Sequence, residues 1–172
     1  MMPYVVDANV MNMFQSERFN GAAGLACSAL DEITDNSFIV LDETGHCKDE
    51  WISCAGGKPP IALEDWIADM FVRQRLQLAT FINDSMYQEL NNQGIPKRDH
   101  KWVRLARSAN ANVIVTEDID LFDPKKKNAC TSAAKAKIKS GRKGPVAKYL
   151  KKSYKIDVIC VEHVSQFIEQ PS

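Results

Sequence analysis

Four short runs of almost entirely apolar residues, rich in β-branched side chains, divide this chain into segments with helical spacing. Apolar runs of this length that do not alternate with polar residues are typical of strands buried on both faces. Strands that alternate with helices form parallel sheets covered by helices on each side. We therefore predict an α/β fold, a three-layer α/β/α sandwich with a mostly parallel central sheet. The predicted strands are residues 4–6, 38–41, 113–116 and 157–161.

The segments between these strands carry the helical pattern. The clearest is residues 63–79, where apolar side chains recur at 3.6-residue spacing and where we expect Trp66, Met70 and Phe71 in the core. Residues 55–60 (AGGKPP) predict a loop, and residues 81–84 a short extended piece. The other predicted helices are residues 8–14, 21–34, 46–54, 98–109, 133–139, 146–152 and 163–169.

The size and composition favour one domain and no membrane. A chain of 172 residues fits a single core, so we assign residues 1–172 to one domain. No apolar run approaches the roughly 18 residues that a membrane helix needs, and the start of the chain lacks the pattern of a signal peptide. The five cysteines include no C-x-x-C pair, which favours free thiols in a reducing compartment. We expect a cytoplasmic protein.

Charge is segregated along the chain although the formal net charge is zero. Residues 124–156, here called the basic segment, hold 12 of the 22 Lys and Arg residues and no Asp or Glu. Such a block is either a solvated, lysine-rich surface or a strip that contacts phosphates and gains free energy by releasing counterions. The residues we nominate for nucleic-acid binding are Lys125, Lys126, Lys127, Lys137, Lys139, Arg142 and Lys143.

Acidic side chains follow the predicted strands at the positions where each strand ends. Ligands of open parallel sheets bind outside the carboxyl ends of the strands. Carboxylates gathered there repel one another and raise each other's pKa unless a cation intervenes, and hard divalent ions take such oxygen ligands. We therefore predict a Mg²⁺ or Mn²⁺ site suited to phosphodiester hydrolysis. Its candidates are Asp7, Asp42, Glu43, Glu50, Asp99, Asp118 and Asp120.

Several of these residues have plainer interpretations. Asp7 and Asp99 each stand where a helix begins and could simply cap it, and Asp120 could form a turn. We expect Glu117 to face solvent and His100 to lie on the surface. Among the aromatic residues, Trp51 and Tyr87 could stack on a base, although packing in the core or at its rim is favoured for both.

Two separated motifs carry a resemblance to a known family. Residues 5–10 (VVDANV) and residues 113–122 (VIVTEDIDLF) are similar to the opening and closing motifs of the PIN-domain nucleases. The resemblance spans residues 4 to about 123, and the last predicted strand and helix fit the ending of that family. It implies an α/β/α sandwich with three or four clustered acids. It also implies cleavage of RNA, and in some branches DNA, with Mg²⁺ or Mn²⁺, by attack of water that leaves a 5′-phosphate.

The resemblance also implies roles for individual residues. Glu50 is the favoured second acid because the family places a Glu on the helix after the second strand, with Asp42 and Glu43 as rivals. The remaining matches are Asp7 as the first metal ligand, Asn9 as its polar companion, Asp99 as the third acid, Asp118 as the fourth, Asp120 as a secondary acid and Thr116 as the hydroxyl that orients the site.

The sequence thus favours a metal-dependent nuclease that acts on RNA ahead of DNA. The first alternative is a catalytically inactive PIN-like module that binds nucleic acid or protein. A phosphatase is a weaker alternative, because that class wants a second Asp two residues after the first, where this chain has Asn9. A homo-oligomer or an inhibitory protein partner also stays open.

Overall fold

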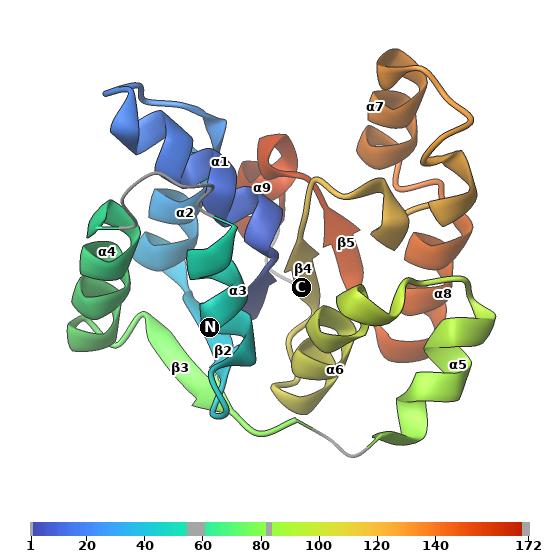
Figure 1. Ribbon diagram of the computed structural model, residues 1–172, viewed down its shortest axis with the longest axis horizontal. Helices are drawn as coiled ribbons and strands as arrows, with labels where there is room; N and C mark the ends of the chain where they lie inside the picture. The colour runs from blue at the N-terminus through green and yellow to red at the C-terminus, as the bar shows by residue number, and fades with distance from the viewer. Residues whose placement is uncertain (1, 55–60, 82–83, 170–172) are drawn as a thin grey trace.

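A five-stranded, entirely parallel sheet forms the centre of the protein in this computed structural model, which describes residues 2–54, 61–81 and 84–169. The strand order is β3-β2-β1-β4-β5. The strands are β1 (Pro3–Val6), β2 (Phe38–Asp42), β3 (Leu76–Ala79), β4 (Val113–Val115) and β5 (Asp157–Ile159). The α/β fold and the parallel sheet predicted from the four apolar runs are confirmed (Figure 1).

Helices cover both faces of this sheet, as a three-layer sandwich requires (Figure 1). The chain moves one way in the sheet from β1 to β3 and the opposite way from β4 to β5. Right-handed crossovers therefore place α1 and α2 on one face and α6 and α8 on the other. The helices are α1 (Ala8–Phe19), α2 (Leu25–Asn36), α3 (His46–Ser53), α4 (Ile61–Val72), α5 (Tyr87–Asn92), α6 (His100–Ser108), α7 (Ser132–Ser140), α8 (Pro145–Tyr154) and α9 (Val164–Ile168).

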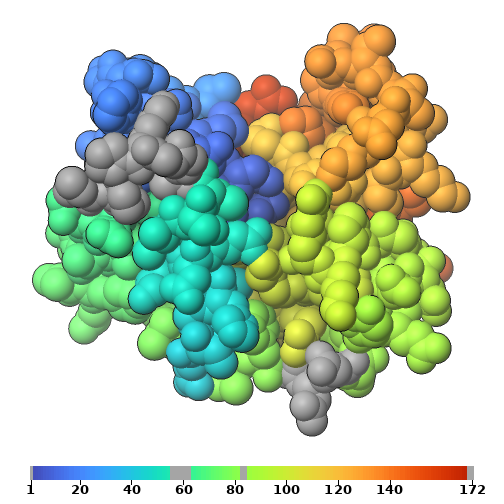
Figure 2. Space-filling view, in the orientation of Figure 1, coloured from blue at the N-terminus to red at the C-terminus, as the bar shows by residue number. Residues whose placement is uncertain are grey.

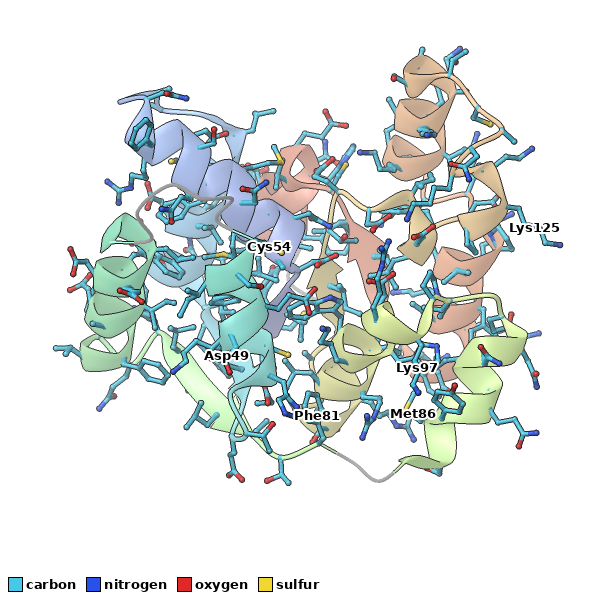
Figure 3. All side chains as sticks on the ribbon, viewed as in Figure 1. Asp49, Cys54, Phe81, Met86, Lys97 and Lys125 are labelled. Atoms are coloured by element: carbon cyan, nitrogen blue, oxygen red, sulfur yellow. The ribbon has the colours of Figure 1, made fainter. Side chains whose placement is uncertain are left out.

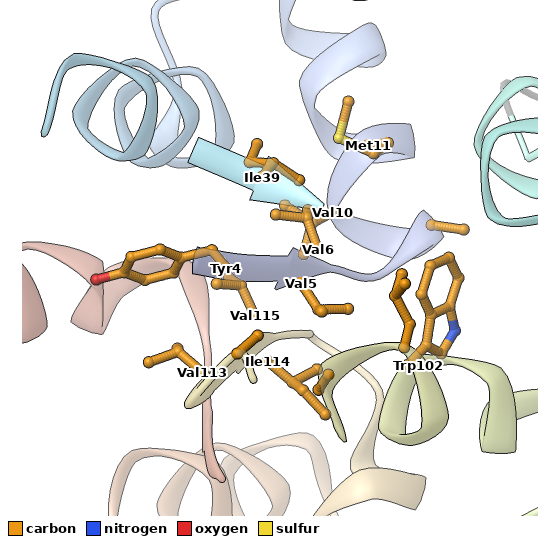
Figure 4. Packing of buried hydrophobic residues seen from close by; sticks show 14 of the residues in the cluster. Tyr4, Val5, Val6, Val10, Met11, Ile39, Trp102, Val113, Ile114 and Val115 are labelled. Atoms are coloured by element: carbon orange, nitrogen blue, oxygen red, sulfur yellow. The ribbon is translucent and has the colours of Figure 1, made fainter. Parts of the chain in front are cut away.

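The central strand β1 is apolar because it is buried on both faces. Val5 packs beside Ile114 of β4 and Trp102 of α6, whereas Val6 points toward Val10 of α1 (Figure 4). Burying each such side chain contributes roughly 1.5–3 kcal/mol. The register pairs Val5 with Ile114, so the carboxyl ends of β1 and β4 lie side by side. This pairing positions the site.

The helix predicted over residues 63–79 is wrong in its second half. α4 ends at Val72, Gln74 adopts a left-handed φ of 58°, and Leu76–Ala79 form the edge strand β3. The helical spacing continued through Leu78 only by coincidence, since Leu78 is exposed in an edge strand. Trp66 and Met70 are buried as expected, but Phe71 is 38% exposed. The predicted loop at residues 55–60 lies outside the described residues.

The extended piece predicted at residues 81–84 is not borne out where the structure describes it. Residues 82 and 83 lie outside the described part of the chain, and Asp84–Met86 form a 3₁₀ turn that leads into α5. The extended strand of this region comes a few residues earlier, as β3. No helix in the part of the chain that the structure describes is long and apolar enough to cross a membrane.

The basic segment folds into α7 and α8, close to the two helical pieces predicted there. It leaves the sheet after β4 and returns to the same place, because the Val146 backbone N–H donates to the Phe122 carbonyl (3.0 Å). Gly144 lies against this carbonyl so closely that a Cβ atom would stand 2.0 Å from its oxygen. Between these points α7 extends away from the sheet (Figure 1, orange).

Candidate metal centre

The ends of β1 and β4 are joined by a small network of polar side chains. The Thr116 hydroxyl donates to Asp7 Oδ2 (2.6 Å), and Asn9 Nδ2 donates to the same oxygen (2.8 Å). The chain after β4 is tied to the network as well: the Glu117 N–H donates to Asn9 Oδ1 (2.9 Å) and the Asp118 N–H to Thr116 Oγ1 (3.0 Å). The side chain of Asp7 makes no capping hydrogen bond to α1. Its contacts therefore favour the network over the capping interpretation.

Three of the predicted acids converge beside this network. Asp99, Asp118 and Asp120 each offer a carboxylate oxygen, and these three atoms lie within 4.8 Å of one another. Asp118 and Asp120 come from the turn after β4, where the Asp120 N–H donates to Asp118 Oδ1 (3.0 Å). Asp99 comes from the residue before α6, whose first turn it does not cap with its side chain. We call these three residues the acidic trio.

One buried carboxylate oxygen of the trio accepts no hydrogen bond from the described residues. Asp99 is only 5% exposed, and no group in the described part of the chain donates a hydrogen bond to its Oδ2 atom. Arg98 forms a long ion pair with that oxygen, with its Nε atom 3.6 Å away. A buried carboxylate oxygen that lacks a hydrogen bond is costly unless a cation satisfies it.

The electrostatics of the site reflect this crowding. Burial, followed by repulsion from Asp118 and Asp7, raises the pKa of Asp99 to about 7. Burial also raises the pKa of Asp7, with a smaller contribution from Asp118, although the hydrogen bond from Thr116 opposes the shift. Both carboxyl groups therefore hold their protons more tightly than an exposed Asp does.

Two basic side chains partly neutralise the trio. Arg98 Nη2 donates to Asp120 Oδ2 (3.2 Å) and lies 3.6 Å from Asp118 Oδ2. Lys127 forms an ion pair with Asp120, and its Nζ atom is 4.0 Å from Asp118 Oδ1. Arg98 is absent from our sequence predictions, although its position next to Asp99 in the chain was a usable signal. Lys127, nominated for nucleic acid, contacts the acids instead.

The structure does not bring Glu50 into the trio. Glu50 lies on α3 and forms an ion pair with Lys101 of α6. Of its two rivals, Asp42 caps α3 by accepting from the Cys47 N–H (2.7 Å) and the His46 N–H (2.9 Å). Burial acts to raise the pKa of Asp42, but hydrogen bonds from Thr44 and the α3 backbone outweigh it and lower this pKa.

The other rival, Glu43, is exposed and accepts from the Thr80 hydroxyl (2.9 Å). Asp42 and Glu43 are thus both engaged outside the trio, the first as a helix cap and the second at the surface.

The donor set of the trio fits a small divalent cation. Oxygens on opposite sides of a Mg²⁺ ion stand about 4.2 Å apart, twice the roughly 2.1 Å length of a Mg–O bond. Adjacent oxygens stand about 3.0 Å apart, and at least two of the three pairs in the acidic trio would be adjacent. The three oxygens, which lie within 4.8 Å of one another, would therefore draw closer together when the ion binds. Carboxylate oxygens are the ligands that Mg²⁺ and Mn²⁺ prefer, and Asp99 Oδ2 accepts no hydrogen bond from a described group that would compete with the ion.

Besides Lys127, the nominated basic residues form two groups, of which the first lies near acidic side chains. Lys139 forms an ion pair with Glu117 (2.6 Å), and Arg142 lies 4.0 Å from Asp157 and over the ring of Phe167. The other group is exposed and consists of Lys125, Lys126, Lys137 and Lys143.

A pocket of about 340 Å³ joins the acids to the basic segment. Asn9, Asp118, Lys127, Lys135 and Lys139 are among the residues that line it. Three half-buried lysines of the basic segment therefore lie in the same pocket as Asp118.

Two further sequence expectations are wrong. Glu117 does not simply face solvent, because its Oε1 accepts from the Val161 N–H (2.9 Å) while its Oε2 pairs with Lys139. His100 is buried rather than on the surface, with its Nε2 atom 2.8 Å from the Ile95 carbonyl oxygen. Trp51 packs in the core as favoured, and its Nε1 donates to the Val6 carbonyl (2.9 Å).

Comparison with known proteins adds nothing to this geometry: no protein-family model, no curated protein and no solved structure matches the chain.

Proposed function

We propose that the protein is a metal-dependent nuclease that hydrolyses phosphodiester bonds at the acidic trio. The observation that carries the proposal is the buried Asp99, whose Oδ2 has no hydrogen-bond donor among the described residues and which offers one carboxylate oxygen within 4.8 Å of those of Asp118 and Asp120. A buried carboxylate of this kind is stabilised by a nearby positive charge. Arg98, 3.6 Å away, provides part of that charge, and a bound metal ion would provide the rest.

Each residue of the site has a separate role in the proposed reaction. Asp99, Asp118 and Asp120 would hold Mg²⁺ or Mn²⁺, which when bound supplies Lewis-acid stabilisation of the phosphoryl oxygens and activates water. Asp7 is not among the three carboxylates that lie within 4.8 Å of one another, so the ligand role that the resemblance implies for it stays a prediction. Thr116 and Asn9 fix the orientation of its side chain. Arg98 and Lys127 stand beside the trio and can pair with the phosphate when a metal ion takes over the carboxylates.

The kind of nucleic acid rests on the resemblance to the PIN-domain nucleases, which favours RNA over DNA. The resemblance also implies that Glu50 is a direct metal ligand, and this role stays a prediction. In the structure Glu50 forms an ion pair with Lys101. A cytoplasmic location also belongs to the proposal, and the five cysteines support it because all are free thiols.

The second candidate function is a PIN-like module that binds nucleic acid or protein without cleaving. The observation in its favour is the neutralisation of Asp118 and Asp120 by Arg98 and Lys127, which lets the acids persist without a metal ion. Calorimetric titration with Mn²⁺ discriminates the two candidates, since a pure binder has no need of the ion.

The direct test is to incubate the purified protein with end-labelled single-stranded RNA and, separately, DNA of the same sequence, with Mn²⁺ or with EDTA. We expect cleavage of RNA that requires Mn²⁺ and disappears in Asp118→Asn. Cleavage in EDTA, or equal cleavage by Asp118→Asn, would contradict the proposal. Cleavage of DNA alone would keep the metal chemistry and overturn the preference for RNA.

A further inference from the structure

A second, larger pocket is lined by Arg98, which also pairs with the acidic trio. It has a volume of about 820 Å³, within the range of roughly 300–1,000 Å³ that is common for small-molecule sites. Its walls come from the start of α3 and from the segment that carries α5 and α6, which lie side by side on one face (Figure 2). Phe81 and Lys97 of this pocket are labelled in Figure 3.

The pocket is basic and contains no acidic side chain among its lining residues in the described part of the chain. Lys97, Arg98, Lys101 and Arg104 all contribute to it, and they come from a stretch of only eight residues. Arg98 pairs with the acidic trio and Lys101 with Glu50, so part of this positive charge is neutralised, and the part that remains favours an anionic ligand.

Aromatic rings stand among these cations. Tyr87 is 40% exposed and has the Lys97 ammonium 5.4 Å from its ring centroid. Phe81 carries the Arg104 guanidinium 5.1 Å from its ring centroid. Of these two rings, Tyr87 is the exposed one, since Phe81 is half-buried against the core. An exposed ring among basic groups is what proteins use to hold an unpaired base, because the ring stacks on the base while the cations contact the phosphate.

A buried histidine completes the wall. His100 lines the pocket and is 3% exposed, and its ring packs edge-on against Tyr87 at a centroid distance of 5.3 Å. The Nε2 atom bonds to the Ile95 carbonyl, whereas no described group pairs with Nδ1. Because this nitrogen is buried, His100 packs against Tyr87 from within the wall and does not present the atom to a ligand.

Arg98 connects the pocket to the acids. It lines the pocket and at the same time pairs with all three members of the trio. A strand whose phosphate reaches the trio therefore has its neighbouring nucleotide within reach of this pocket.

We propose that the pocket of Tyr87, Lys97, Lys101 and Arg104 is a nucleotide subsite, which stacks one unpaired base of a single-stranded nucleic acid on Tyr87 and holds its phosphate with the basic residues. The inference rests on the proposed function for the position of the strand, and it adds a recognition element to the cleavage site. An acidic peptide would use the cations but has no need of the exposed ring.

Equilibrium binding in EDTA tests the subsite without cleavage. The probe is a fluorescein-labelled ten-nucleotide oligouridylate, followed by anisotropy, with a duplex of equal length for comparison. We expect Tyr87→Ala to raise the dissociation constant at least about fivefold, the low end of the loss of one base–aromatic stack. Tyr87→Phe, which keeps the ring, should bind like the parent. Phe19→Ala removes an exposed aromatic side chain on α1 and should also leave binding unchanged.

A second variant keeps the test sound if Tyr87→Ala folds poorly. Lys97→Gln should weaken binding and reduce the slope of log K against log salt by about 0.7, the value for one lost phosphate contact on a single strand. The basic segment contributes equally to binding in every variant, so these differences report on the pocket.

The outcomes separate this inference from the proposed function. Weaker binding by Tyr87→Ala in a protein that shows no metal-dependent cleavage would support the subsite and overturn the nuclease. Unchanged binding by Tyr87→Ala and Lys97→Gln would overturn the subsite, whatever the cleavage assay shows. Equal affinity for the duplex, or displacement of the probe by polyglutamate with no effect of Tyr87→Ala, would also overturn it and indicate a general polyanion surface.

Discussion

Thr116 and Asp7 lie 109 residues apart in the chain and share a hydrogen bond of 2.6 Å at the carboxyl ends of two adjacent strands. Thr116 Oγ1 also accepts from the Asp118 N–H, so one hydroxyl links the buried Asp7 to the turn that carries two members of the trio. Any change at Asp7 should therefore reach the orientation of Asp118.

The first prediction concerns Asp7→Asn. The amide retains an oxygen that accepts from Thr116, so the fold should persist, but the negative charge beside the trio is lost. We expect Mn²⁺-dependent cleavage to fall by at least roughly 10- to 100-fold, the range for groups that orient metal ligands. Asp49→Asn, the same substitution at an exposed position of α3, is the matched control. Undiminished cleavage by folded Asp7→Asn protein would rule out this role.

The second prediction follows from the raised pKa of Asp99. The folded protein holds this proton more tightly than the unfolded chain, so the stabilisation is complete below about pH 4 and is lost as the pH rises through about 7. Without metal, Asp99→Asn avoids this loss. Its advantage in unfolding free energy over the parent should grow from pH 4 to pH 8, to at most about 4 kcal/mol. Urea unfolding in EDTA at several pH values measures it, and an advantage that does not change with pH would contradict the assignment.

A third prediction uses the competition between Lys127 and a metal ion for the same carboxylates. Lys127→Gln removes one cation from Asp118 and Asp120, so Mn²⁺ should bind more tightly. The gain should be about fivefold, because a partly exposed ion pair contributes up to about 1 kcal/mol. Lys126→Gln, a change at an exposed neighbour, should leave the calorimetric affinity unchanged. Weaker Mn²⁺ binding by Lys127→Gln would mean that Lys127 supports the site rather than competing.

The fourth prediction concerns the exposed lysines near α7. Replacing three of them by Gln should lower the affinity for labelled single-stranded RNA in EDTA and reduce the salt slope by up to about 2, at 0.7 for each lost phosphate contact. A triple variant with the same change in charge on the α8 side should have a smaller effect. An equal effect of the two would show that net charge alone attracts the ligand. The first set is Lys125, Lys126 and Lys137, and the control set is Lys148, Lys152 and Lys155.

A fifth prediction compares two fully buried tryptophans. Trp51 Nε1 donates to the Val6 carbonyl, whereas no described group accepts from Trp102 Nε1. Trp51→Phe should therefore destabilise the protein by about 1–3 kcal/mol more than the loss of ring volume alone, since a buried carbonyl loses its partner. Trp102→Phe removes a donor that is already unsatisfied and should cost less. Thermal unfolding of the two variants makes the comparison, and equal losses would argue against the hydrogen bond's contribution.

The sequence predicted those parts of the fold that burial controls. The strands β1, β2, β4 and β5 are apolar runs because both of their faces are covered. β3 escaped prediction because it is an edge strand with exposed Gln77 and Leu78, and its residues continue the spacing of the preceding helix. The change from helix α4 to strand β3 takes place in exposed residues, so it does not alter the spacing of the apolar residues.

The candidate site was predictable to the extent that topology alone places residues. Asp7, Asp118 and Asp120 follow adjacent strands, and their position at one edge follows from the parallel sheet. The ion pairs of Arg98 and Lys127 depend on how long side chains fold back across the surface, which no spacing in the sequence encodes. The capping bonds of Asp42 are local, because their donors, His46 and Cys47, follow it within five residues.

The close approach of Gly144 to the Phe122 carbonyl brings together the two ends of the excursion that contains α7. A chain that departs and comes back at one point can be shortened, lengthened or exchanged there while the strands on either side keep their pairing. The excursion is thus a place where this protein can acquire a new specificity, by drift or by engineering, without having to refold its centre.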